Sequence, residues 1–127
     1  MTTIGGRSFN SMSEFKGPEA LSWLTHNRNV CALAGNRFHT TAAAIEAVKR
    51  LYAVGATEVY VGIPLDEPER IQREGGPYAD ALEIVFPGEK TKEVMAVVRS
   101  LQPDAGGKMK DIIKKEGGSK LVMLSWD

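Results

Sequence analysis

The chain has 127 residues, of which 43% are apolar and 25% are charged, and its formal net charge is zero. This length and composition are typical of one folded globular domain and exclude a disordered chain, and the neutral balance removes the usual first indication of nucleic-acid binding. The single cysteine, Cys31, excludes an internal disulfide and any multi-cysteine metal site.

Two absences in the sequence bear on location. No run approaches the roughly 18 consecutive apolar residues of a membrane span, and the first residues lack the apolar core of a signal peptide. We therefore expect a cytoplasmic protein with no membrane partner.

Charge is unevenly distributed along the chain. Residues 1–57 carry a net charge of +3, residues 58–87 carry −5, and residues 88–127 carry +2. Such a pattern is most simply interpreted as solvated loops and helix faces.

The N-terminal quarter is predicted to be an arm. Residues 1–16 are rich in Ser, Gly and Asn and are expected to be loosely attached. A short helix follows over 17–24, with Pro18 in its first turn. We accordingly divide the chain into an arm with a short helix, residues 1–29, and a single α+β domain, residues 30–127.

The domain begins with an apolar run that predicts a strand over 30–34. Thr40 or Thr41 then caps a helix that extends to Val54 and ends at Gly55. Apolar residues at helical spacing, from Ala44 to Tyr52, form its inward face.

The remaining elements follow from periodicity. Alternating patterns predict strands over 57–63 and 79–86, and an apolar run predicts a last strand over 120–126. Helices are predicted over 89–101 and 108–116. The connection over 64–78 is long and is expected to contain a short helix capped by Asp66 and ended by Gly75.

The predicted order of elements is β-α-β-β-α-(α)-β, which fits two folds. One is the ferredoxin-like sandwich, a four-stranded antiparallel sheet with helices on one face. The other is a small parallel α/β sheet covered on both faces. The second and third strands alternate, as open antiparallel strands do, so the ferredoxin-like arrangement is favoured.

The segment between the predicted first strand and the next helix is the best candidate for a ligand site. It contains Arg37, His39, Thr40 and Thr41. A strand that leads into a helix N-terminus offers free backbone N–H groups and partial positive charge to an anion, and Arg37 adds a bidentate donor. We predict a small anionic ligand there. The alternative is that Thr40 or Thr41 only caps the helix and that Arg37 and His39 are solvated.

A second candidate surface is the face of the sheet that the helices leave open. Tyr60, Glu83 and Trp126 are predicted to lie on or beside it, and exposed aromatic residues on a sheet indicate a subunit interface or a binding surface. A bulky Trp126 next to the C-terminus also suggests that this end is held in place, either at an interface or in the core.

We predict a small cytoplasmic binding domain, a homodimer through the open sheet face, with no cofactor and no metal site. One alternative is a small enzyme in which His39 acts as general acid or base, Arg37 binds an anionic substrate, and Asp80 or Glu83 orients the proton. Another is weak nucleic-acid binding through the lysines between Lys108 and Lys120, although no aromatic residue is interleaved with them.

Overall fold

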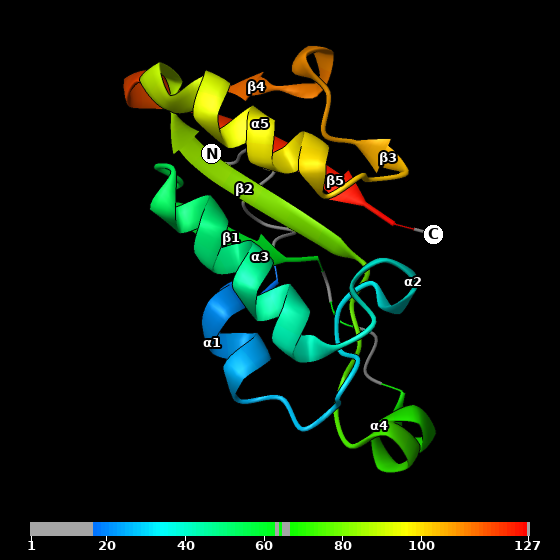
Figure 1. Ribbon diagram of the computed structural model, residues 1–127. Helices are drawn as coiled ribbons and strands as arrows, with labels where there is room; N and C mark the ends of the chain where they lie inside the picture. Colours follow the sequence, from blue (N-terminus) through cyan, green and yellow to red (C-terminus); the bar gives the residue numbers. More distant parts are fainter. Residues whose placement is uncertain (1–16, 63, 65–66, 127) are drawn as a thin grey trace.

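The computed structural model describes residues 17–62, 64 and 67–126. In that part of the chain, five strands form one sheet in the order β1-β2-β5-β3, and β4 also pairs with β5 (Figure 1). All of these pairs are antiparallel. The strands are β1 Glu58–Val61, β2 Ala81–Pro87, β3 Ala105–Gly106, β4 Ile113–Lys114 and β5 Ser119–Ser125.

Helices α3 and α5 lie side by side across one face of this sheet, α1 packs against α3 and β1, and α4 lies apart from the others (Figure 1). The α-helices are α1 Ala20–Thr25, α2 Gly35–Phe38, α3 Thr41–Ala53, α4 Pro68–Glu74 and α5 Thr91–Ser100, and short 3-10 turns are η2 Gly88–Lys90, η3 Met109–Asp111 and η4 Glu116–Gly118. None of these described helices is long and apolar enough to cross a membrane.

Helix α3 confirms the prediction for this segment. The Thr40 hydroxyl accepts a hydrogen bond from the Ala43 N–H at 3.1 Å and so caps the helix. Ala44, Val48 and Leu51 are fully buried at helical spacing. Gly55, at φ 118°, follows the end of the helix in a conformation that other residues rarely adopt.

The strand register separates two faces of the sheet. Val59, Ile84 and Val122 are paired across β1, β2 and β5, and all three are fully buried in the main core beneath the helices. The next row, Tyr60–Glu83–Met123, lies on the opposite side because side chains alternate along a strand. We call this side the second face; its side chains are those of Glu58, Tyr60, Glu83, Val85, Ile113, Leu121 and Met123.

The predicted strand over 30–34 is wrong. Within the part of the chain that the structure describes, its one strand-like contact is an isolated parallel bridge between Leu33 and Ala79. The Ala32 N–H is bonded instead to the Thr41 hydroxyl at 2.8 Å, and the Cys31 N–H to the Asn29 side chain at 2.9 Å. Side chains therefore accept hydrogen bonds from backbone N–H groups of this loop, in place of a neighbouring strand. The apolar run has the composition of a strand but does not adopt its conformation.

The predicted helix over 108–116 is also wrong. This segment forms η3, the short strand β4 and the start of η4. Gly117, at φ 71°, and Gly118, at φ 82°, make a tight turn, and the Lys115 N–H donates to Ser119 O at 2.8 Å. The turn brings β4 back against β5, so pairing with β5 replaces helix formation.

The α+β class with an open antiparallel sheet is thus confirmed, whereas the ferredoxin-like topology with four strands is not. The expected first strand does not form, and two short strands are added beside β5. The parallel alternative does not match the antiparallel pairing. The predicted arm over 1–16 and the predicted cap Asp66 lie outside the described residues.

Candidate functional site

Arg37 lies at the end of α2 and reaches across to the end of α5. Its Nε donates to Leu101 O and its Nη2 to Ser100 O, both at 2.9 Å. Carbonyl groups at a helix C-terminus lack partners within the helix and carry partial negative charge. Arg37 therefore caps α5 with a positive charge.

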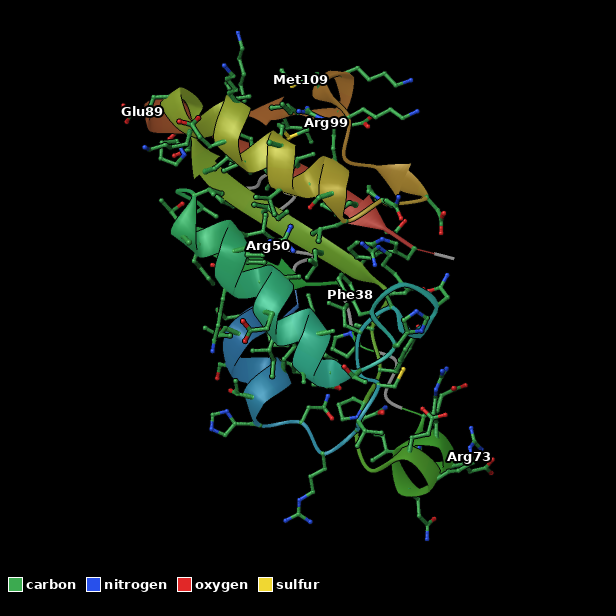
Figure 2. All side chains as sticks on the ribbon, viewed as in Figure 1. Phe38, Arg50, Arg73, Glu89, Arg99 and Met109 are labelled. Atoms are coloured by element: carbon green, nitrogen blue, oxygen red, sulfur yellow. The ribbon has the colours of Figure 1, made fainter. Side chains whose placement is uncertain are left out.

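Trp126 completes the same region. Its Nε1 donates to Leu101 O at 2.9 Å, and its ring meets that of Phe38 edge to face with a centroid separation of 5.3 Å. Only 2% of Trp126 is exposed. We call Arg37, Phe38, Ser100, Leu101 and Trp126 the C-terminal corner. Figure 2 shows Arg50 on α3 nearby, and its Nη2 donates to the Ser100 hydroxyl at 2.6 Å.

The other predicted anion ligands serve the backbone or face solvent. The Thr41 hydroxyl is buried and donates to Asn29 O at 2.6 Å, in addition to accepting from Ala32. Thr40 caps α3. His39 is exposed at φ 68°, a conformation rare for residues other than glycine. These contacts explain Arg37, Thr40 and Thr41 without a ligand, and anion binding at this segment stays a prediction.

The predicted interface residues are divided between the two sides of the sheet. Tyr60 and Glu83 are register partners on the second face, whereas Trp126 lies in the core. The Tyr60 hydroxyl donates to Glu58 Oε1, and this hydrogen bond, with partial burial, raises the pKa of Tyr60 to about 12. Glu83 is only 3% exposed.

The enzyme alternative needed Arg37 and His39 near Asp80 or Glu83. Glu83 belongs to the second face, while Arg37 caps α5 on the helical face, so the sheet separates this pair. The backbone of Asp80 accepts a hydrogen bond from the Trp126 N–H at 2.9 Å. Within the described residues, no group of three or more His, Cys, Asp or Glu side chains is placed to hold a metal ion.

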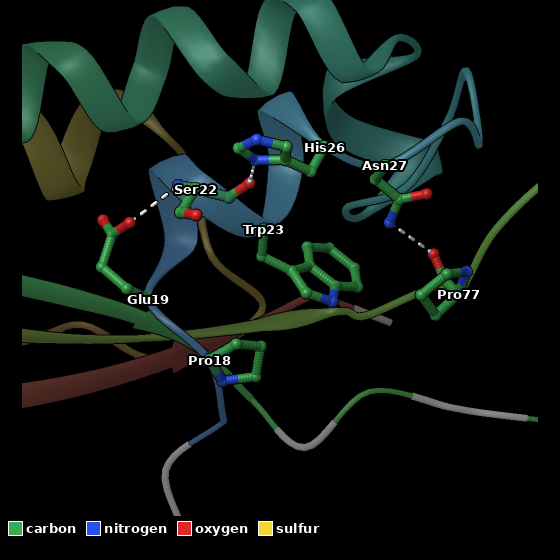
Figure 3. Close-up of a pocket in the computed structure, with 7 residues that line it drawn as sticks. All are labelled: Pro18, Glu19, Ser22, Trp23, His26, Asn27 and Pro77. Atoms are coloured by element: carbon green, nitrogen blue, oxygen red, sulfur yellow. Dashed lines mark hydrogen bonds between the residues drawn. The ribbon is translucent and has the colours of Figure 1, made fainter.

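A cavity of about 370 Å³ lies beside α1, a size within the range of ligand pockets. Figure 3 shows Trp23 in the middle of this region, with the rings of Pro18 and Pro77 on either side. The indole is half-buried. We call this cavity the Trp23 pocket; it is lined by Pro18, Glu19, Ser22, Trp23, His26, Asn27 and Pro77.

Glu19 is the charged end of the pocket. Its Oε1 accepts from the Ser22 N–H at 2.7 Å, and its Oε2 accepts from the Leu21 N–H at 2.9 Å and from the Tyr52 hydroxyl at 2.5 Å. Partial burial alone would raise the pKa of Glu19, but the hydrogen bonds from Tyr52, Ser22 and Leu21 outweigh it and lower the pKa. Glu19 is therefore ionised at neutral pH. Burial and the bond to Glu19 raise the pKa of Tyr52 to about 12.

Several other acceptor oxygens of the pocket are also engaged. Pro77 O accepts from the Asn27 amide at 3.0 Å, and Asn27 Oδ1 accepts from the Asn29 N–H at 2.9 Å. The His26 ring turns back onto α1, where its Nδ1 donates to Ser22 O at 2.8 Å (Figure 3). Pro18 O accepts from the Val61 N–H at 3.0 Å.

The indole N–H of Trp23 differs from these groups. Among the residues that the structure describes, no acceptor is hydrogen-bonded to Trp23 Nε1. The Trp126 indole, by contrast, donates to Leu101 O. A buried indole normally finds a partner, so a half-buried indole whose N–H has none among the described residues leaves a donor available beside this cavity.

Sequence analysis did not single out this pocket. One wall of the pocket comes from a short stretch of sequence that begins at Pro18. Spacing of one helical turn along α1 and its two caps brings together Glu19, Ser22, Trp23 and His26. That spacing was a usable signal for one wall of the pocket. Pro77 could not have been found in this way because it lies fifty residues from Asn27, its hydrogen-bond partner.

Comparison with known proteins adds no functional information. No protein-family model, no curated protein and no solved structure matches this chain. The functional argument therefore depends on the geometry of the second face and of the Trp23 pocket.

Proposed function

We propose that this protein is a small binding domain that forms a homodimer through the second face of its sheet. The observation that carries the proposal is a pair of exposed apolar side chains on that face, Ile113 at 42% and Met123 at 39% exposure. Large exposed apolar side chains that lie together indicate an interaction surface, whereas scattered ones do not.

The strand register supports the claim that these two side chains are neighbours. Ile113 is paired with Leu121 across β4 and β5, and Met123 follows Leu121 two positions later, on the same side of the sheet. Met109, 60% exposed, belongs to η3 between β3 and β4 and is seen close to β4 in Figure 2. Three exposed apolar side chains thus belong to one end of the sheet.

The rest of the second face is mostly closed to solvent, which confines the proposed contact to this end. Val85 and Leu121 are buried, yet they do not belong to the main core that α1, α3 and α5 share with the other face. In the row Tyr60–Glu83–Met123, Tyr60 is half-buried, Glu83 is buried and Met123 is exposed. Solvent exposure is therefore greatest at the β5 side of the row. The exposed end at β4 and β5 is the part that a second copy would cover.

Charge favours a second copy as the occupant. Charges of both signs lie beside β4, where Lys110 and Lys115 are next to Asp111 and Glu116. A twofold axis beside β4 allows the acidic residues of each copy to face the basic residues of its partner. The zero net charge of the chain adds no overall repulsion between copies.

The test is the solution mass of the full chain, measured by light scattering over a range of concentrations. We expect a dimer for the wild type and a monomer for Met123→Glu, because the substitution places a charge in the apolar contact. Val30→Glu is the matched control, since Val30 is 78% exposed in a loop away from the sheet. It should stay dimeric, with circular dichroism showing that both variants are folded.

Two results would overturn this proposal. A wild type that stays monomeric at high concentration would exclude the dimer. A Met123→Glu variant that stays as dimeric as Val30→Glu would show that the copies meet at another surface.

A further inference from the structure

We propose that the Trp23 pocket binds a proline-containing peptide segment in extended conformation, a function separate from dimer formation. The pocket lies beside α1, whereas the proposed dimer contact lies at β4 and β5. The inference therefore does not depend on the oligomeric state. It rests on the shape, the hydrogen-bonding groups and the charge of the pocket.

The apolar surface of the pocket is made of rings. The Trp23 indole is half-buried, and the rings of Pro18 and Pro77 flank it (Figure 3). Flat aromatic surfaces bordered by other rings are the surfaces on which the pyrrolidine rings of extended peptides pack. A proline-rich segment is already extended before it binds, so it loses little conformational entropy.

The free donor of the pocket calls for a ligand that offers an acceptor. The carboxylate of Glu19 and the carbonyl oxygens of Pro18 and Pro77 already accept hydrogen bonds from the protein. The Trp23 N–H, in contrast, has no partner among the described residues. A proline residue offers a carbonyl oxygen and has no backbone N–H to satisfy, which is the complementary pattern.

Charge argues against the simplest competing ligand, a flat aromatic acid. Glu19 is ionised at neutral pH and lines the pocket, so it repels a carboxylate that approaches Trp23. A neutral tertiary amide meets no such repulsion, and a basic residue next to the proline would be attracted. The favoured occupant is therefore a neutral or basic proline-containing segment.

The experiment is a titration of the isotope-labelled full chain with a capped poly-L-proline peptide, followed through the two indole N–H signals in NMR spectra. We expect a saturable shift of the Trp23 signal. The Trp126 signal is an internal control that should not move, because its N–H is bonded to Leu101 O in the core. A capped Gly-Ser peptide of the same length and benzoate serve as control ligands and should leave both signals in place.

A conservative variant isolates the hydrogen bond. Trp23→Phe keeps an aromatic ring and removes the N–H, and we expect it to weaken peptide binding by about two- to tenfold, the usual effect of one hydrogen bond. Backbone amide signals around α1 report binding in this variant, and the Trp126 signal reports that it is folded.

Three outcomes would overturn the proposal. The Trp23 signal could stay in place at millimolar poly-L-proline, which would show that the pocket does not bind such a segment. The Gly-Ser peptide could shift it equally, which would show that proline is not recognised. Benzoate could shift it while the proline peptide does not, which would identify a site for aromatic acids.

Discussion

The two tryptophans of this chain lie in regions that use their polar atoms in opposite ways. In the C-terminal corner, the Trp126 indole and the Arg37 guanidinium both donate to Leu101 O, and the ring is buried against Phe38. In the Trp23 pocket, the Glu19 carboxylate and the carbonyl oxygens of Pro18 and Pro77 accept from the protein, but the indole N–H has no partner among the described residues. A closed network of this kind stabilises the fold, whereas a free donor beside a cavity is available to a ligand.

The largest effect that would test this comparison is expected for Trp126→Ala. The substitution removes a fully packed ring and one of the two donors to Leu101 O, so the free energy of unfolding should fall by about 3 to 5 kcal/mol. Urea denaturation followed by far-UV circular dichroism measures it. Trp23→Ala is the matched control and should cost less, because Trp23 is only half-buried. An equal cost would mean that the Trp23 pocket is as structural as the corner.

A smaller effect is expected for Arg37→Lys. Lysine keeps the charge but cannot bond both Ser100 O and Leu101 O in the planar geometry of a guanidinium. We expect a loss of about 1 to 2 kcal/mol in the free energy of unfolding, again measured by urea denaturation.

The same pair of proteins tests the predicted anion site. If Arg37 acts only as a cap, phosphate should change the stability of wild type and Arg37→Lys equally. Saturable stabilisation of the wild type that disappears in the variant would show that Arg37 binds anions in addition to capping α5.

Sequence periodicity was sufficient where local pattern and burial agree. Helix α3 follows from Thr40 and the spacing of Ala44, Val48 and Leu51, and β2 follows from the alternation of Leu82, Ile84 and Phe86. In these elements the apolar residues recur with the period of the helix or strand that they form. The segment alone therefore indicates its secondary structure.

The prediction failed where the deciding contacts are distant in the sequence. Residues 32–34 of the apolar run are buried, but the Thr41 and Asn29 side chains satisfy the backbone of the run, so no strand forms. The anion site was inferred from that strand. Arg37 instead bonds a carbonyl 64 residues away, a contact that no local pattern encodes. The Trp23 pocket was missed because Pro77, the far wall of the pocket, meets Trp23 only through the fold.

The smallest effect on the free energy of unfolding is expected for Glu19→Gln. Glu19 shares features of both regions, because it lines the Trp23 pocket and its carboxylate is hydrogen-bonded within the protein. It caps α1 and accepts from Tyr52. Glutamine keeps one acceptor oxygen and loses the charge, so we expect a loss of about 0.5 to 1 kcal/mol at neutral pH. Glu46→Gln is the matched control and should have a smaller effect, because Glu46 lies on the exposed side of α3 and, among the described residues, pairs only with Lys49.

The pH dependence decides whether the charge of Glu19 is responsible. Its pKa in the folded protein lies below the ordinary value of 4.5, so its stabilising contribution is complete above pH 4.5 and is lost as the pH falls through the lower, folded-state pKa. The stability gap between wild type and Glu19→Gln, measured by urea denaturation at a series of pH values, should therefore narrow in acid. A gap that stays constant as the pH falls would mean that glutamine disturbs the packing of α1. In that case the charge of Glu19 would not be what stabilises α1.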